Sequence, residues 1–479
     1  MSVIGYTFGM EGPGVEVSEE VSVNGAGPSG GNRPRVCVIG AGSSGITALR
    51  SLKERGIDYE CFEKGSYIGG NWKYDNDNDQ SAAYKSLHIN TSRQMMEYSK
   101  FPMPVDFPDY PDHFRIQQYF EDFVDHFDLR DTIRFQTEVE SVVPAEEGGW
   151  DVTWSSRDGE SGTDHFTDVM VCNGHHWDKR WPEPAFPGSD TFEGEQMHAH
   201  DYRTPEIFEG KRVLVLGIGN SATDIAVEAS RHADATFLAM RRGAWVLPKY
   251  IGSMPTDRAT TGPMARAPIA IQSLGMSLML RLAVGKPTVY GLPKPDHKLL
   301  HAHPTVSQDL YGRLGHGDID VKPNIERLDG DSVVFEDGTR EQVDLIVYCT
   351  GYKITFPFLE PEIFNADENK VDLYLRVAAP DQKGLYFIGL IQPLGAIMPL
   401  AEVQCDWVAE LIDGEGALPD KLEMYREIAD DQAKMGRRFV KSKRHTVEVD
   451  FDPYLRALQK ERAASRARAV SGTLATAAA

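Results

Sequence analysis

The sequence predicts an α/β protein with two Rossmann-like dinucleotide-binding domains, because two glycine motifs each follow an apolar run. Residues 35–45 read RVCVIGAGSSG, and residues 212–222 read RVLVLGIGNSA. Each pattern is typical of a buried parallel strand, a tight glycine turn and the start of a helix. The turn lets the backbone approach a pyrophosphate, and the helix start offers free N–H groups. Two such motifs in one chain predict two dinucleotides, and therefore an enzyme that transfers electrons between them.

A repeated strand pattern predicts how the two domains are connected. An alternating strand, a turn with an Asp-Gly pair and a returning strand form an antiparallel meander twice, at 150–172 and at 332–349. The second glycine motif falls between these two meanders, so the second domain is predicted to be inserted into the first. Prolines mark the two linkers. The predicted divisions are a disordered N-terminal extension (1–33), the first domain in two parts (34–180 and 300–450), the inserted domain (181–299), and a C-terminal helix and tail (451–479).

Composition excludes several classes of protein. The 479 residues carry a formal net charge of -22, which makes nucleic acid an unfavourable partner. Five cysteines without C-x-x-C spacing indicate free thiols in a reducing cytoplasm, and the histidine pairs lack the partners of a metal site. No run reaches the ~18 apolar residues that can span a bilayer. The nearest, 267–285, is broken by Gln272 and Arg281 and is predicted to be a buried or groove-lining helix, in preference to a membrane-surface helix.

The residues that end the second strand of each domain predict which nucleotides bind. Glu63 follows the first motif at close to the ~20-residue spacing at which an acid binds ribose hydroxyls, so this site suits FAD or NAD. Arg241 and Arg242 occupy the corresponding position in the second domain, where guanidinium groups can pair with a 2′-phosphate, so that site suits NADP. Residues 69–72 (GGNW) leave two interpretations open: a loop along a flavin, or an ordinary turn with a packed indole.

Together these features resemble the flavin-containing monooxygenases, the class B flavoprotein monooxygenases. The stretch 192–202, FEGEQMHAHDY, fits the family pattern F-x-G-x-x-x-H-x-x-x-(Y/F) at every fixed position. Baeyer–Villiger relatives end this motif in Trp followed by Pro or Asp, whereas this chain has Tyr202-Arg203. The resemblance covers roughly residues 34–440 and departs at Asn173, where relatives often carry Thr or Ser. Further matches are LHINTSR (87–93), FPMP (101–104), CTGY (349–352) and GLIQPLG (389–395).

The resemblance implies a role for particular residues. Glu63 would bind the FAD ribose, and Asn90 would lie beside the flavin C4a atom, where oxygen adds. Arg241 and Arg242 would bind the 2′-phosphate of NADP. The remaining implied contacts are Gly40, Gly42 and Gly45 to the FAD pyrophosphate; Gly70, Asn71, Trp72, His88 and Gln392 along the flavin or its ribityl chain; and Gly217, Gly219, Asn220 and Ser221 to NADP. His198 is expected to link the domains by a hydrogen bond.

The implied activity is NADPH- and O2-dependent oxygenation of a tertiary amine nitrogen or a sulfide sulfur, through a C4a-hydroperoxyflavin stabilised by bound NADP⁺. Baeyer–Villiger oxidation of ketones is the alternative within the same family. A disulfide reductase with two dinucleotides would need a cysteine pair, and no two of the five cysteines lie within four residues of each other. A homodimer is left open. The basic residues Arg437, Arg438, Lys441, Lys443 and Arg444 are predicted to form a solvated helix end, in preference to an oligomer contact or an attachment to an anionic membrane.

Overall fold

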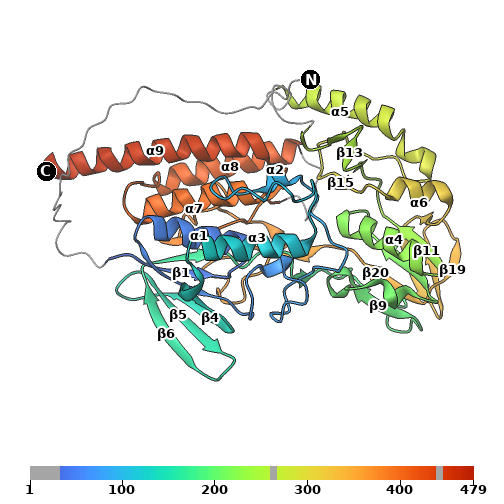
Figure 1. Ribbon diagram of the computed structural model, residues 1–479, viewed down its shortest axis with the longest axis horizontal. Coiled ribbons are helices and arrows are strands. Elements are labelled where there is room, and N and C mark those ends of the chain that lie inside the picture. Colours follow the sequence, from blue (N-terminus) through green and yellow to red (C-terminus); the bar gives the residue numbers. More distant parts are fainter. Residues whose placement is uncertain (1–32, 259–266, 439–445, 479) are drawn as a thin grey trace. The chain divides into compact units, whose positions relative to one another are not determined.

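The computed structural model describes residues 33–258, 267–438 and 446–478 (Figure 1). The chain divides at Arg33, and all elements described below belong to residues 34–479. The predicted disorder of residues 1–33 falls almost entirely outside the described residues.

The first glycine motif lies in a five-stranded parallel sheet. Its strands β1 (Arg35–Ile39), β2 (Asp58–Phe62), β3 (Ile133–Arg134), β7 (Asp168–Val171) and β22 (Leu385–Phe387) follow the order β22-β7-β1-β2-β3. Every pair in this sheet is parallel. Val36 and Val38 of β1 are buried against helices that include α1 (Ser43–Glu54), α3 (His113–His126) and α7 (Met398–Ile412). Cys37 and Ile39 are buried on the other face of the sheet, in a second core that contains Val142 and Trp150. The apolar run of the motif is therefore a central strand, as predicted.

The second motif lies in a second parallel sheet of the same construction. The strands β9 (Glu195–His198), β10 (Arg212–Leu216), β11 (Ala235–Ala239), β16 (Asp320–Lys322) and β20 (Leu345–Tyr348) follow the order β16-β11-β10-β20-β9. Helix α4 (Asn220–His232) follows β10, and α6 (Leu310–His316) precedes β16. The two glycine turns are fixed by equivalent hydrogen bonds, one from Gly40 N to Phe62 O and one from Gly217 N to Ala239 O, each 2.8 Å long. The prediction of two Rossmann-like units is thus confirmed.

Each parallel sheet carries an antiparallel meander. The first consists of β4 (Thr137–Pro144), β5 (Trp150–Ser156) and β6 (Ser161–Phe166), and the second of β17 (Ile325–Asp329), β18 (Ser332–Phe335) and β19 (Arg340–Gln342). The meander predicted at 332–349 ends earlier than expected, because β20 (Leu345–Tyr348) pairs with β10 in the parallel sheet. The meander predicted at 150–172 also ends earlier, because the chain changes sheets at Thr167. Its N–H donates to Arg35 O (2.8 Å), so β6 ends the meander and β7 enters the parallel sheet beside β1.

The inserted domain ends later than the sequence indicated. Residues 300–349 were assigned to the first domain, but β16 pairs with β11 and β20 pairs with β10. The prolines between 287 and 295 mark turns inside the second domain, where Pro287 begins the short helix η7 (Pro287–Tyr290). The chain crosses between the domains at β8 (Asp178–Lys179) and β21 (Tyr352–Lys353), which pair antiparallel. The insertion therefore extends to about residue 349.

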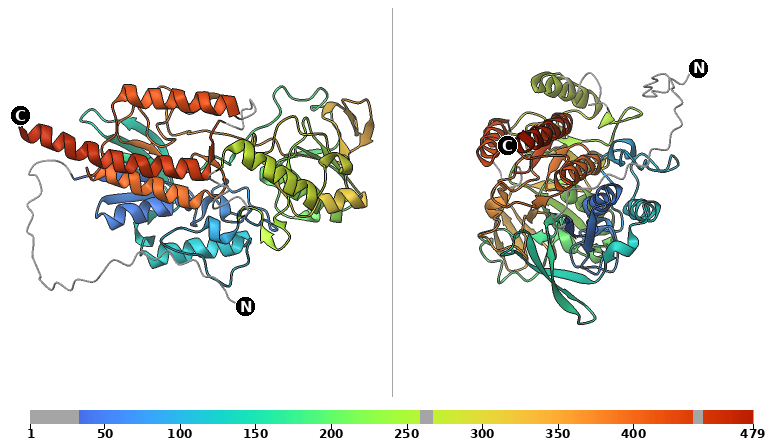
Figure 2. Two further views of the ribbon diagram at one scale, coloured as in Figure 1. Left: turned by 90° about the horizontal axis from the view of Figure 1, so that it is seen from above. Right: turned by 90° about the vertical axis from the view of Figure 1, so that its left-hand side faces the viewer.

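Three long helices follow in the C-terminal part: α7, α8 (Lys421–Arg438) and α9 (Phe451–Ala478). Helix α9 runs along α7 (Figure 2). The buried carboxylate of Glu410 on α7 pairs with Arg55, Arg462 and Arg466, so α9 is held by charge as well as by packing.

The prediction that the basic residues around 437–444 form a solvated end was wrong for Arg438. Its guanidinium is one-fifth exposed, pairs with Asp450 and donates to Leu300 O (3.3 Å). Lys441, Lys443 and Arg444 lie outside the described residues.

The helix predicted within 267–285 is present as α5 (Ile269–Ala283), but only one of its faces is buried. Ser273, Met276 and Leu280 are buried, whereas the opposite face points outward. In the part of the chain that the structure describes, no helix combines the length and apolarity needed to cross a bilayer. The cytoplasmic location and the homodimer stay predictions.

Candidate functional site

The first glycine turn contains two glycines that close packing requires and a third glycine that lies beside open space. Gly40 has φ +98°, and a Cβ there would stand 2.9 Å from Cys172 O. A Cβ on Gly45 would overlap the carbonyl oxygen of Gly40, so this glycine lets α1 approach the turn. Near Gly42, by contrast, a Cβ would meet only the backbone of Gly70, at 3.7 Å. The backbone at the start of α1 is therefore accessible to a ligand, and no side chain caps this helix end.

Glu63 lies at the end of β2, beside this turn, and is only 3% exposed. Its carboxylate accepts hydrogen bonds from Ala41 N and Gly65 N, both 2.8 Å long. Burial raises the pKa of Glu63 above its ordinary value, against the opposing effect of these backbone donors. Asn78 also donates to Glu63, at 3.3 Å. Asn78 was not predicted, and no motif in the sequence indicates it.

The loop with the GGNW sequence lies against the first glycine turn. It forms the short helix η1 (Gly70–Trp72), and Gly69 N donates to Ala41 O at 3.0 Å. The Asn71 side chain accepts from Ala82 N (2.9 Å), and Ser81 donates to Asn71 O (3.0 Å). Trp72 packs against the core of the first domain. Asn71 thereby fixes the chain that leads from the glycine turn towards residues 84–90.

Asn90 combines a fixed backbone with a free side chain. Ile89 N donates to Pro111 O (3.1 Å), and Lys249 Nζ donates to Ile89 O (3.1 Å). Just after Asn90, both the N–H and the hydroxyl of Ser92 donate to Asp257, at 2.6 and 2.7 Å. The half-buried Asn90 amide itself makes no hydrogen bond with any described residue. It is therefore held in place and available to a ligand.

His88 and Gln392, the other two residues expected along the flavin, lie in segments that lead away from the first glycine turn and the start of α1. His88 is exposed, and its Nδ1 lies 2.8 Å from Ser86 O. Gln392 begins β23 (Gln392–Leu394), which pairs in parallel with β24 (Glu448–Asp450). The segment that leads to Gln392 starts at Gly389, where a Cβ would overlap the Ser44 hydroxyl. This segment therefore runs against the start of α1.

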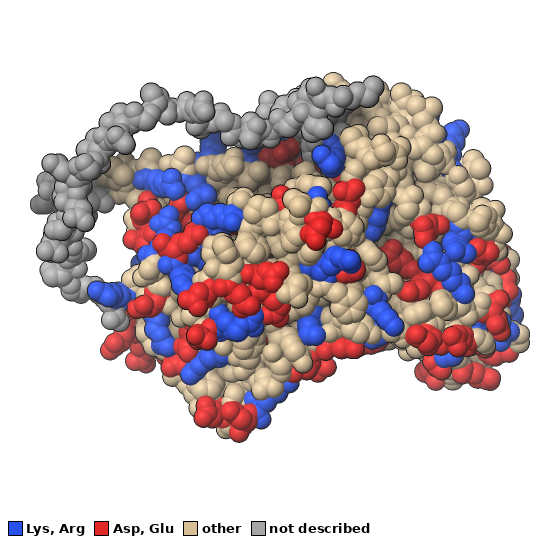
Figure 3. All heavy atoms as spheres, viewed as in Figure 1, with Lys and Arg blue, Asp and Glu red and all other residues tan. Residues whose placement is uncertain are grey.

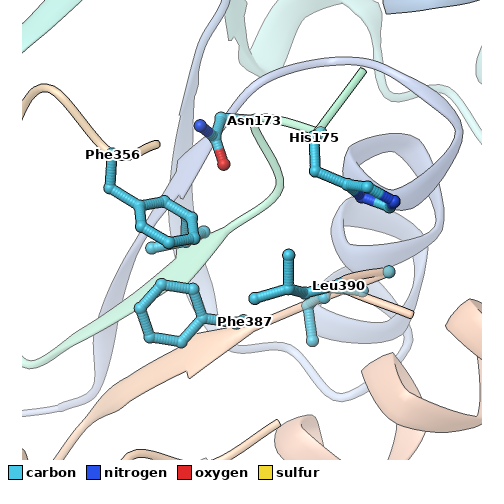
Figure 4. A pocket seen from close by; sticks show the side chains of 9 residues that line it. Asn173, His175, Phe356, Phe387 and Leu390 are labelled. Atoms are coloured by element: carbon cyan, nitrogen blue, oxygen red, sulfur yellow. The ribbon is translucent and has the colours of Figure 1, made fainter. Parts of the chain in front are cut away.

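A narrow cavity opens at the carboxyl ends of β7 and β22 (Figure 4). It is lined by Asn173, His175, Phe356, Phe387 and Leu390, among others. The Nε2 atom of His175 is buried and has no hydrogen-bond partner among the described residues. Burial holds the pKa of His175 well below its ordinary value, so its imidazole is neutral. Asn173, the departure from the family pattern, donates to Thr355 O at 3.3 Å and is accommodated without disturbing the sheet.

The second glycine turn is closed by a segment that the sequence did not indicate. Gly217 has φ +136°, and a Cβ there would stand 2.8 Å from Cys349 O. Gly219 precedes α4, whose first residues are Asn220 and Ser221. The Asn220 amide oxygen accepts from Val306 N (2.8 Å), and the Thr305 hydroxyl donates to Ile218 O (2.5 Å). The start of α4 is again uncapped by a side chain.

Arg241 and Arg242 follow the end of β11 after Met240, one and two residues beyond the place that Glu63 occupies after β2. Both side chains are exposed, and neither forms an ion pair with a described acidic residue. Arg242 lies close enough to Asp296 to help lower the pKa of that carboxyl. Two unpaired guanidinium groups therefore stand where the nucleotide specificity of this fold is set.

The 192–202 motif connects the two domains. His198 is 1% exposed; its Nε2 donates to Gly351 O (3.1 Å) and its Nδ1 accepts from His200 N (3.1 Å). Burial lowers the pKa of His198 to about 4, so it acts as a neutral hydrogen-bonding link to the segment between the domains. His200 and Arg203 make contacts that the sequence did not indicate: they donate to Asp79 O (3.2 Å) and Ser81 O (3.0 Å) in the loop of the first domain.

A polar cavity of about 260 Å³ lies beside the Asn90 loop, between residues 84–88 and α4. Tyr84 donates to Asp224 (2.5 Å), and burial raises the pKa of Asp224 to about 6. Burial also lowers the pKa of Lys249, which lines the same cavity. The cavity thus brings ionisable groups of both domains next to the loop that carries Asn90.

The cysteines do not form a redox centre. Burial raises the pKa of all five thiols, which disfavours the reactive thiolate that a disulfide reductase needs. Within the described residues there is also no group of three His, Cys, Asp or Glu side chains that could hold a metal ion.

Comparisons with known proteins agree with this geometry. The family model "Flavin-binding monooxygenase-like" matches residues 33–467. Flavin-containing monooxygenase 5 of Oryctolagus cuniculus is 39% identical over 432 residues, which are 87% of this chain and 80% of that protein. Dimethylaniline monooxygenase [N-oxide-forming] 2 of Rattus norvegicus is 38% identical over 453 residues, 89% of this chain and 82% of that protein.

Among solved structures, S-allyl-L-cysteine S-oxygenase from Allium sativum superimposes with a TM-score of 0.68 at 29% identity, covering 90% of this chain and 88% of that one. A cyclohexanone monooxygenase shares the fold, with a TM-score of 0.67 at 18% identity over 92% of this chain and 98% of that one. The chain therefore belongs to the flavin-binding monooxygenase-like family and is an oxidoreductase that uses FAD and NADP.

Proposed function

We propose that this flavin monooxygenase uses NADPH and O2 to oxygenate soft nucleophiles, either the nitrogen of tertiary amines or the sulfur of sulfides. The observation that carries the proposal is the Asn90 amide, which has no described hydrogen-bond partner although its backbone is fixed on both sides. The names of two relatives, an N-oxide-forming monooxygenase and an S-oxygenase, support these two substrate classes. The Tyr202-Arg203 ending of the motif supports them over the Baeyer–Villiger alternative.

The residues of the first domain fit FAD. The turn at Gly40 and the open space beside Gly42 would receive the pyrophosphate at the start of α1, while Gly45 permits the close approach of that helix. Glu63 would bind the ribose. Gly70, Asn71, Trp72, His88 and Gln392 would line the flavin and its ribityl chain. The buried, unpartnered Nε2 of His175 provides a further neutral group at the same edge of the sheet.

When bound, FAD accepts a hydride from NADPH and activates O2 for transfer to the substrate. The protein orients the substrate, excludes water and hydrogen-bonds the reacting oxygen. Asn90 would donate that bond from its amide, and it would do so at every pH because an amide does not titrate. The polar cavity beside the Asn90 loop would lead the substrate to this amide from the side of α4.

In the second domain, Gly217, Gly219, Asn220 and Ser221 would bind the pyrophosphate and nearby ribose of NADP, and Arg241 and Arg242 its 2′-phosphate. A double Arg241→Ala, Arg242→Ala variant should raise the KM for NADPH by roughly 10- to 100-fold, because two charge-assisted bonds are lost. The KM for NADH, which lacks the 2′-phosphate, should change by less than about twofold.

Steady-state kinetics with both nucleotides measure this difference. The matched control is Arg327→Ala with Arg340→Ala, two exposed arginines on the meander of the same domain. Equal effects of the Arg241/Arg242 change on both nucleotides would contradict the 2′-phosphate role.

The proposed function is tested by product analysis of the purified FAD-loaded enzyme with NADPH, O2 and, separately, trimethylamine, thioanisole or cyclohexanone. We expect an N-oxide and a sulfoxide in amounts that match the NADPH consumed. A lactone formed from the ketone without N-oxide or sulfoxide would favour the Baeyer–Villiger alternative. Consumption of NADPH with hydrogen peroxide as the sole product in all three reactions would overturn the proposal.

A further inference from the structure

The loop that carries Asn90 belongs to the first domain, but the second domain holds it on both sides of this residue. Before Asn90, Lys249 Nζ donates a hydrogen bond to Ile89 O (3.1 Å). After it, Asp257 accepts from both the N–H and the hydroxyl of Ser92, at 2.6 and 2.7 Å. Ile89 and Ser92 are completely buried, so water does not compete for these bonds. The place of Asn90 therefore depends on two residues of the inserted domain.

Lys249 is held more firmly than a surface lysine. Its backbone oxygen accepts a hydrogen bond from the Tyr110 hydroxyl (2.6 Å), and its Nζ lies 5.0 Å from the centroid of the Tyr110 ring. Burial lowers the pKa of Lys249, and the nearby carboxylates of Asp224 and Asp309 oppose this effect. Among the described residues its ammonium group forms no ion pair, and its hydrogen bond goes to Ile89 O. The strongest directional contact of this group is thus with the Asn90 loop.

Lys249 is also joined to the second glycine turn, where NADP is expected to bind. It lies two residues after the end of β12 (Val246–Leu247), which pairs in parallel with β15 (Thr305–Val306). Strand β15 is in turn bonded to the glycine turn, through Ile218 O and the Asn220 amide oxygen. A contiguous series of short contacts therefore runs from the glycine turn through β15, β12 and Lys249 to the loop with Asn90.

Helix α4 makes a second connection between the same two places. It begins at the second glycine turn, and its carboxylates Asp224 and Glu228 lie one and two turns farther along. Asp224 accepts from the Tyr84 hydroxyl (2.5 Å), and Glu228 accepts from the Ser86 hydroxyl (2.8 Å). The chain that leads to Asn90 is therefore attached to the helix whose start would face the nucleotide.

We propose that Lys249 is a positioning residue that makes the place of Asn90 depend on the occupancy of the NADP site. A nucleotide bound at the second glycine turn would hold β15 and β12, and Lys249 would pass this restraint to Ile89 O. Without the nucleotide, the loop would open more often, because fewer contacts hold the strands that carry Lys249. The restraint itself does not depend on the oxygenation of amines or sulfides, but its consequence for product formation rests on the proposed function.

Hydrogen exchange of the FAD-loaded enzyme, measured by mass spectrometry with and without saturating NADP⁺, tests this inference. In the unchanged enzyme NADP⁺ should slow the exchange of the amides of residues 89–92 by about tenfold, the value of one hydrogen bond from a charged donor. A Lys249→Met variant keeps a long side chain but cannot donate, so NADP⁺ should slow its exchange by less than about twofold. A Lys249→Arg variant can donate and should recover the effect.

The matched control is Lys298→Met, which removes an exposed lysine of the same domain. Basic side chains are scattered among acidic ones over the face that Figure 3 shows, so the loss of one of them changes the surface charge little. This variant should respond to NADP⁺ like the unchanged enzyme. Lys249→Gln replaces Lys249→Met if that variant does not load FAD. The inference is overturned if NADP⁺ leaves the exchange of residues 89–92 unaltered in the unchanged enzyme, or slows it equally without Lys249.

Assays of product and hydrogen peroxide separate this inference from the proposed function. The Lys249→Met enzyme should be reduced by NADPH within about twofold of the ordinary rate but should release roughly 3- to 10-fold more of its oxygen as peroxide. The Lys249→Arg enzyme should form product like the unchanged one. If exchange depends on Lys249 as expected while the product yield stays the same, the link from nucleotide to loop is supported and the role proposed for Asn90 is contradicted.

Discussion

An Asn90→Ala enzyme should still be reduced by NADPH but should form oxygenated product roughly 100- to 1,000-fold more slowly. The methyl group of alanine cannot donate a hydrogen bond to the reacting oxygen, and the neighbouring contacts of Ile89 and Ser92 keep the loop in place. The oxygen consumed should appear as hydrogen peroxide. Anaerobic stopped-flow reduction measures the first half of the reaction, and product and peroxide assays under air measure the second.

Lys85→Ala provides a matched control, because its side chain is exposed on the same loop while its backbone carries the contact with Arg203. This variant should reduce and oxygenate like the unchanged enzyme. If the Asn90→Ala enzyme forms product at the ordinary rate, Asn90 does not bind the reacting oxygen. If its reduction by NADPH fails as well, the residue maintains the site in a more general way.

A Gly45→Ala change should abolish FAD binding and destabilise the first domain by more than about 3 kcal/mol. The added Cβ would overlap the carbonyl oxygen of Gly40, and neither residue can move freely because Gly40 is bonded to the sheet and Gly45 lies in α1. The helix must then move away from the turn, and its free N–H groups move with it. Flavin absorbance per mole of purified protein and the thermal unfolding midpoint measure the two effects.

Gly312→Ala is the control, since Gly312 lies within α6 and no atom lies within 4 Å of the position of its added Cβ. It should bind FAD fully and unfold at an equal or slightly higher temperature, because alanine favours a helix. A Gly45→Ala protein with a full complement of FAD and an unchanged midpoint would show that the helix can shift without loss of the site.

Local sequence patterns were sufficient for the two nucleotide-binding folds. The apolar runs at 35–39 and 212–216 and the glycines after them specify strand, turn and helix within about fifteen residues, and the structure contains both units. The acid after β2 and the arginines after β11 could be located for the same reason, because they occur at a set distance from those turns. The roles proposed for them rest on that position and on the family pattern, whereas the role of Asn90 comes from the family pattern alone, and all of them stay predictions.

Other features depended on contacts between distant parts of the chain. The prolines near 287–295 suggested a linker, but the pairing of β16 and β20 with strands a hundred residues away extends the insertion to about residue 349. The closure of the second glycine turn by Thr305 and Val306, and the contacts of His200 and Arg203 with the first domain, also link distant residues. Helix α5 shows the physical reason most clearly. Its sequence is largely apolar on all sides and therefore predicts burial. Which of its faces is covered depends on the elements that pack against it, and only the tertiary structure decides that.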